Sequence, residues 1–175
     1  MNRTSWVITN FTLFLLLVLM AASVQSSLLH WLIGWRATIQ VVIVIFTYIC
    51  LYRSPTEALL FSIVAFFSIG LMSNMLQSVS VFSAICMFLA LRTVRTRIYS
   101  SSPVHFTWTA LGAIFGFHLI SWLTAEIFET NPPHAHVLDW VLEVLITSLF
   151  VRLLYVIFIW LDRQTKRLTI IELNS

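Results

Sequence analysis

The sequence has very little formal charge, and this excludes most classes of soluble protein. Charged residues make up 10% of the 175 residues and hydrophobic residues 59%, whereas a typical soluble chain is about 25% charged. Ten basic and seven acidic side chains cannot coat a water-soluble domain of this size. We therefore predict an all-α polytopic membrane protein solvated by membrane lipids, and exclude a nucleic-acid-binding domain and a conventional cytosolic enzyme.

Cysteine is also scarce, and the sequence lacks the common catalytic motifs. Cys50 and Cys86 both lie inside apolar runs, where free thiols behave as small hydrophobic side chains. No CxxC pair and no Cys/His spacing typical of zinc occurs. HExxH, GxGxxG, P-loop and nucleophile-elbow motifs are absent as well. We therefore expect no enzyme activity and no cofactor.

Long apolar runs divide the chain into six expected helices of one integral membrane domain (1–175). A spanning helix needs about 20 mainly apolar residues. The expected helices cover residues 6–24, 37–52, 58–76, 79–91, 106–128 and 137–161. The first is interpreted as an uncleaved span, and residues 27–35 as an interfacial segment because tryptophan favours the headgroup level. Residues 53–57 are expected to form a turn around Pro55, since proline cannot continue a helix.

A charge-free run from Ala58 to Leu91 decides the expected topology. As a single helix it would be about 51 Å long, against a bilayer core of about 30 Å. Two crossings with a turn near residues 77–80 put Arg53 on the same side as the basic cluster at 92–97, as the positive-inside rule favours. Both termini are therefore predicted to face the cytoplasm, and the helix at 79–91 is short enough to be partly re-entrant.

Three features inside the expected spans are candidates for recognition. Gly112 and Gly116 form a GxxxG pair, which lets another helix approach closely, either within the chain or in a homodimer or other complex. Arg152 lies near the centre of the last expected helix, where an ionisable side chain is a functional candidate by default, or snorkels toward the cytoplasmic surface. His118 is expected to be a neutral imidazole hydrogen-bonded to a neighbouring Ser or backbone carbonyl, as polar groups often are between membrane helices. A proton relay is disfavoured, because Glu126 is about 12 Å away along the same helix.

Four potential metal ligands lie at the start of the last expected helix: His134, His136, Asp139 and Glu143. Zinc accepts all of these ligand types. In the simpler interpretation the two acidic residues complement the positive N-terminal end of the helix, and the histidines lie in a solvated loop. We favour the second interpretation and predict no metal site.

The helix expected at 58–76 is the most polar, and its Gly70 and Asn74 share one face. Polar groups facing lipid are costly, so this face is expected to meet other helices or a partner. The surrounding stretch SIGLMSNMLQSVSVFSAICMFLALRTVRTR, with chain length, helix order and charge placement, resembles the MreD family of bacterial rod-shape-determining membrane proteins. Gly70 matches the glycine of that family's Gly-x-x-x-Asp segment, whereas Asn74 stands where the acidic residue is usual.

The resemblance implies a non-enzymatic scaffold of the cell-elongation peptidoglycan synthesis machinery in the bacterial inner membrane. It also implies three partners, namely an MreC-like single-pass membrane protein, the elongation peptidoglycan synthase and MreB-like filaments. The implied fold is similar to that of energy-coupling-factor substrate-binding components. Helix packing or partner binding is accordingly expected at five residues: Gly70, Asn74, Gly112, Gly116 and Arg152.

Two other functions stay open at the level of the sequence. The first is a substrate-binding membrane component of a vitamin or metal-ion transporter, which needs a pocket with convergent polar groups. The residues available to line it near the outer face are Trp31, Trp35, Trp122, His134 and His136. The second is an intramembrane enzyme that uses His118 or the histidines at 134 and 136.

Overall fold

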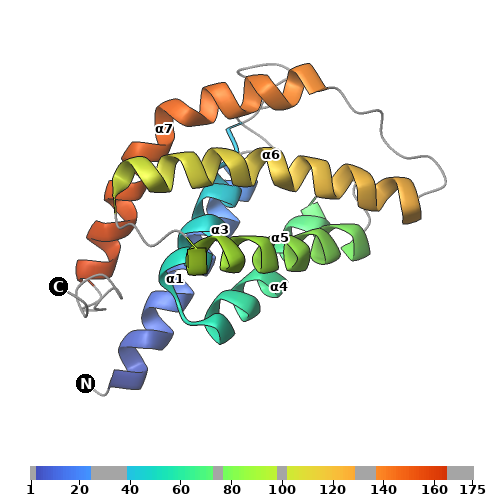
Figure 1. Cartoon of the computed structure of the whole chain (residues 1–175). Helices are drawn as coiled ribbons and strands as arrows, with labels where there is room; N and C mark the ends of the chain where they lie inside the picture. Colours follow the sequence, from blue (N-terminus) through green and yellow to red (C-terminus); the bar gives the residue numbers. More distant parts are fainter. Residues whose placement is uncertain (1–2, 25–38, 73–76, 98–101, 129–136, 165–175) are drawn as a thin grey trace.

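The protein is all-helical wherever its structure is described. The computed structural model describes residues 3–24, 39–72, 77–97, 102–128 and 137–164. Six helices follow one another within these ranges (Figure 1): α1 (Arg3–Val24), α3 (Val41–Tyr52), α4 (Pro55–Met72), α5 (Gln77–Arg97), α6 (Pro103–Phe128) and α7 (Val137–Gln164). The all-α prediction with six helices is therefore confirmed. The proposed interfacial segment at 27–35 lies outside the described residues.

Three of these helices are long and apolar enough to cross a membrane: Gln77–Thr96 of α5, all of α6 and all of α7. Apolar segments of α1, α3 and α4 are shorter. The expected fourth helix, 79–91, was too short, because α5 continues through the basic residues to Arg97 and arginine is a good helix former. The short length that suggested a partly re-entrant helix is therefore not observed. The turn expected near 77–80 is wrong, because Gln77 already begins α5.

Two helices begin at a Ser-Pro pair. Pro55 is the first residue of α4 and Pro103 the first of α6, a position where the missing N–H of proline costs no hydrogen bond. Ser54 accepts a long hydrogen bond at its hydroxyl from the N–H of Glu57 (3.4 Å), the spacing of a capping box. The expected turn over 53–57 is therefore wrong beyond Ser54, since Pro55 starts a helix.

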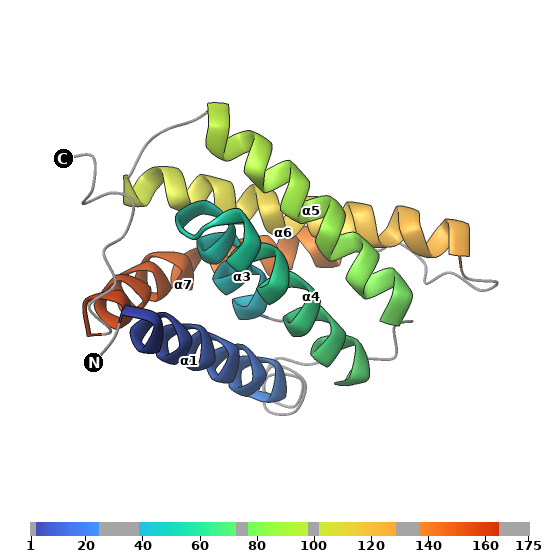
Figure 2. The same cartoon turned by 90° about the horizontal axis from the view of Figure 1, so that it is seen from below.

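Helix α3 lies at the centre of the bundle (Figures 1 and 2). Every side chain from Val42 to Cys50 is buried, as is Tyr52, and the helix contacts α1, α4, α5, α6 and α7. A helix that is apolar around its whole circumference is covered on all sides. Its 12 residues span about 18 Å, so α3 is too short to cross the bilayer core of about 30 Å alone. The helix expected at 37–52 begins at Val41 in the structure, since residues 39 and 40 are not helical; residues 37 and 38 lie outside the described ranges.

Helices α4 and α5 form a hairpin, which confirms the turn-back expected within the run from Ala58 to Leu91. At one end, a Cβ built on Gly70 of α4 would lie 3.3 Å from the Cα of Gln77. At the other end, Arg92 and Arg95 of α5 donate hydrogen bonds to the backbone oxygen of Arg53, at 2.9 and 2.8 Å. α5 therefore returns to the end of the bundle from which α4 started.

Candidate functional site

A buried ion pair joins two helices that are far apart in the sequence. The Arg53 guanidinium, directly after α3, contacts the Asp162 carboxylate near the end of α7, and the two side chains are only 4% and 2% exposed. The sequence predicts a turn at Arg53, and Arg53 does lie in the bend between α3 and α4, but its burial was not expected. The prediction that Asp162 belongs to a tail after residue 161 is wrong, because α7 continues to Gln164. Both charges can be buried because each compensates the other.

Two further side chains complete this polar group. Asn10 of α1 donates to Asp162 Oδ1 at 3.0 Å and accepts at its own Oδ1 from Arg53 Nη2 at 2.9 Å. The Tyr48 hydroxyl of α3 donates to Asp162 Oδ2 at 2.6 Å. Both carboxylate oxygens thus have donors, as a buried charge requires. We call Asn10, Tyr48, Arg53 and Asp162 the Arg53 cluster.

The Arg53 cluster fixes the relative positions of four helices at one end of the bundle. It draws on α1, α3 and α7 directly, and on α5 through the backbone oxygen of Arg53. In Figure 1 the first residues of α1 and the last residues of α7 lie at this end, on the lower left. The ring of Phe14 packs against the Arg53 guanidinium, 5.5 Å from ring centroid to Cζ. In some proteins buried polar groups specify helix register, and we expect the cluster to have the same structural role here.

A second polar group lies between α6, α7 and the start of α3. His118 Nε2 lies 2.7 Å from Glu143 Oε2, with the side chains 20% and 13% exposed. The distance is that of an ion pair, but the contact lacks the in-line geometry of a hydrogen bond. Gln40 donates from its side-chain nitrogen to the same carboxylate oxygen at 2.8 Å, and the imidazole stacks on Trp140 at 5.7 Å between ring centroids.

The sequence predicts a neighbouring Ser or a backbone carbonyl as the partner of His118, whereas the structure places the Glu143 carboxylate there. His118 lies ten residues before the end of α6, and Glu143 six residues after the start of α7. Because α6 and α7 are consecutive antiparallel helices, these two positions lie at similar depth. In the sequence, a carboxylate near His118 was sought only within its own helix, and Glu143 was therefore not found. Of the other potential metal ligands, His134 and His136 lie outside the described residues. No group of three or more His, Cys, Asp or Glu side chains suited to a metal occurs in the ranges that the structure describes.

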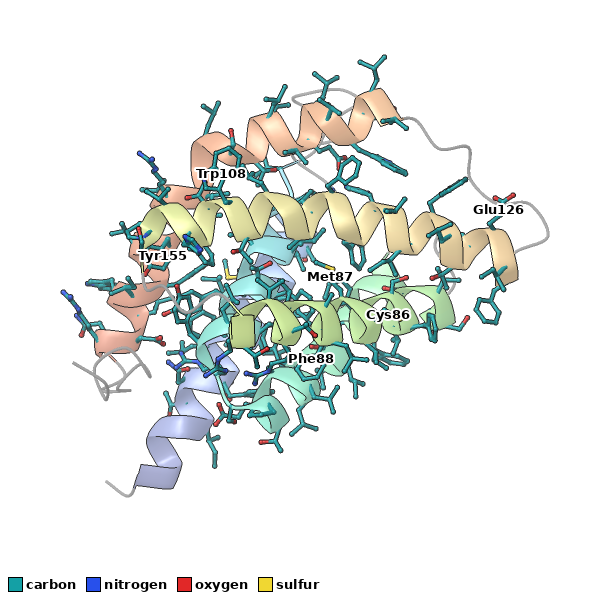
Figure 3. All side chains as sticks on the ribbon, in the orientation of Figure 1. Cys86, Met87, Phe88, Trp108, Glu126 and Tyr155 are labelled. Atoms are coloured by element: carbon teal, nitrogen blue, oxygen red, sulfur yellow. The ribbon has the colours of Figure 1, made fainter. Side chains whose placement is uncertain are left out.

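The two glycines of the GxxxG pair have different surroundings. A Cβ on Gly116 would lie 3.5 Å from the methyl carbon of Met87, whereas a Cβ on Gly112 would have nothing within 4 Å. Figure 3 shows Met87 between α5 and α6. Gly116 therefore serves packing within the chain, and Gly112 lies open on the outside. Exposed apolar side chains flank Gly112 at helical spacing: Trp108 (71%), Phe115 (41%) and Leu119 (40%).

The remaining predicted residues are placed as follows. Gly70 is buried at the approach of α4 to α5, as its face was expected to meet another helix, and Asn74 lies outside the described residues. Arg152 is exposed on α7. An arginine at the centre of a membrane helix costs about 2.5–3.5 kcal/mol on insertion scales.

No protein-family model, no curated protein and no solved structure matches this chain. The assignment of a function therefore depends on the chain's own residues.

Proposed function

We propose that the chain is a non-enzymatic membrane scaffold that binds an MreC-like single-pass protein in the bacterial cell-elongation machinery. The observation that carries this proposal is the open position of Gly112 among exposed apolar side chains of α6. Lipid provides no hydrophobic force between helices, and small residues are used where two helix backbones must come close. Gly116 meets this need inside the chain, and Gly112 offers the same kind of contact to another molecule.

The polar side chains support a scaffold more than a transporter component. The two polar groups described above are engaged within the chain, at Asp162 and at Glu143. A narrow cleft beside Asn10, Arg53 and Glu57 has room for about one water molecule. This cleft is therefore too small for a vitamin or a similar ligand, whose pockets occupy about 300–1,000 Å³.

The proposed orientation follows from the positions of the basic residues. Arg53, Arg92 and Arg95 gather at the end of the bundle where α1 begins and α7 ends. The positive-inside rule favours the cytoplasm for such an end. An inner-membrane location with both termini inside is therefore proposed, and MreB-like filaments would meet this end of the protein. The elongation peptidoglycan synthase is the third partner in this proposal.

The test is co-purification of the MreC-like single-pass protein with the tagged full-length chain from bacterial membranes. Gly112→Leu fills the open position and is expected to remove most of the co-purified partner. Thr12→Leu, which also adds a leucine at an exposed helix position, is the matched control and is expected to retain it. Intact complexes with Gly112→Leu would contradict the proposal, and co-purification of an ATPase with a retained small molecule would favour the transporter alternative.

A further inference from the structure

Arg152 differs from Arg53, Arg92 and Arg95, each of which contacts a polar group of the bundle. Arg53 is paired with Asp162, and Arg92 and Arg95 donate to the backbone oxygen of Arg53. Arg152 is exposed, and no described residue pairs with it. Its charge is therefore uncompensated by the part of the chain that the structure describes.

The position of Arg152 along α7 makes this charge difficult to solvate. It lies nine residues after Glu143 and ten before Asp162, and no other formal charge occurs between those two residues. At about 1.5 Å per residue, Arg152 is about 14–15 Å from either carboxylate, close to half of a bilayer core of about 30 Å. Glu143 and Asp162 are themselves engaged by His118 and Arg53, so neither is available to Arg152.

An apolar stripe runs along α7 on both sides of Arg152. It consists of four exposed side chains that, with Arg152 between them, are spaced three or four residues apart and therefore share one face of the helix: Leu145 (58%), Leu149 (78%), Val156 (63%) and Trp160 (57%). We call these four residues and Arg152 the Arg152 stripe. From residue 145 to residue 160 it extends about 22 Å along the helix, which suits contact with one other spanning helix.

We propose that the Arg152 stripe docks the transmembrane helix of the single-pass partner, and that Arg152 pairs with an Asp or Glu carboxylate on that helix. This inference rests on the proposed function, which places the partner at Gly112 of α6. It adds α7 as a second helix that contacts the partner, and an acidic residue as a feature of the partner helix. A lone carboxylate at mid-membrane depth is as costly in lipid as a lone guanidinium, and pairing relieves both costs. Leucine and valine on either side give the apolar contact along which the two helices pack.

The test uses the full-length protein in phosphatidylcholine vesicles with a photocrosslinking amino acid in place of Leu149. The probe is a synthetic 22-residue leucine-alanine helix with one glutamate at its midpoint, and the matched peptide carries leucine there. The glutamate peptide is expected to crosslink at least tenfold more than the leucine peptide. Arg152→Leu is expected to remove this preference, and Arg152→Glu to transfer it to a peptide with a central lysine. Arg163→Leu, an exposed arginine in the last turn of α7, is the control and is expected to keep the preference.

Equal crosslinking of the glutamate and leucine peptides would overturn the inference. Loss of the preference when phosphatidylglycerol is added would also overturn it, because a lipid headgroup would then be the occupant of Arg152. Co-purification of the MreC-like protein separates this inference from the proposed function. Partner retained by Arg152→Leu but lost with Gly112→Leu would remove the inference and leave the scaffold. Partner retained by both variants would overturn both.

Discussion

Replacing Asp162 by asparagine is expected to destabilise the bundle more than any other single charge removal in α7. The change leaves the Arg53 guanidinium buried, at 4% exposure, without its counter-charge. It also weakens the hydrogen bonds that Asn10 and Tyr48 donate to the carboxylate. Breaking a buried ion pair from one side typically costs about 3–5 kcal/mol, so we expect a loss of this size in the free energy of unfolding.

The measurement is reversible unfolding in bicelles, with the wild type and the variant compared under one condition. Asp139→Asn is the matched control, because it makes the same chemical change in the first turn of the same helix. Loss of its interaction with the helix dipole is expected to cost less than about 1 kcal/mol. A loss for Asp162→Asn no larger than that of Asp139→Asn would refute the structural role of the Arg53 cluster.

A double variant tests the pairing itself. Arg53→Met combined with Asp162→Leu removes both charges and fills the space with apolar atoms, a replacement that is often neutral or stabilising. It is expected to be more stable than Asp162→Asn alone. A double variant as unstable as the sum of its two single variants would show that the charges are not coupled, and the reasoning would fail.

Three further predictions concern helix packing, a buried hydrogen bond and the exposure of the two cysteines. Gly70→Ala places a methyl group 3.3 Å from the backbone of α5 and should lower the unfolding free energy by about 1–3 kcal/mol. The methyl group of Gly112→Ala meets nothing within 4 Å, so this variant should raise the unfolding free energy by about 0.5–1 kcal/mol. Equal effects of the two variants would contradict the close approach at position 70. Tyr48→Phe removes one of the donors to the buried carboxylate and should lower the unfolding free energy by about 0.6–1.7 kcal/mol, measured in the same bicelles; no change would argue against this hydrogen bond. In detergent, a maleimide should modify the half-buried Cys86 much faster than the buried Cys50. Mass spectrometry of the labelled peptides measures the order, and faster modification of Cys50 would contradict its burial.

The number and order of the helices could be predicted from the sequence because charges are rare and mark the ends of apolar runs. Helix ends were predicted less well. The Ser-Pro pair at 54–55 was interpreted as part of a turn, and the helix at 106–128 was expected to begin after Pro103, although proline favours the first position of a helix. Arginines after residue 91 were assigned to a loop, although they extend α5.

The polar contacts could not be predicted, because they join positions far apart in the chain. Arg53 and Asp162 are separated by 109 residues, and a charged residue at a helix end looks the same in a sequence whether it is solvated or paired. Their burial depends on α1 and α7 meeting at α3, which only the tertiary arrangement shows. In the same way the spacing of Gly112 and Gly116 predicted close packing but not that Gly116 alone meets a neighbour in the chain.

The proposed orientation, with the Arg53 end of the bundle facing the cytoplasm, is tested most directly by labelling single cysteines in intact bacterial spheroplasts. In a background of Cys50→Ala and Cys86→Ala, one cysteine replaces Thr96 at the Arg53 end of α5, and another replaces Phe128 at the opposite end of α6. Both positions are exposed. A membrane-impermeant maleimide is expected to label the cysteine at position 128 in intact spheroplasts, and the cysteine at position 96 only after permeabilisation. Labelling of position 96 without permeabilisation would contradict this orientation.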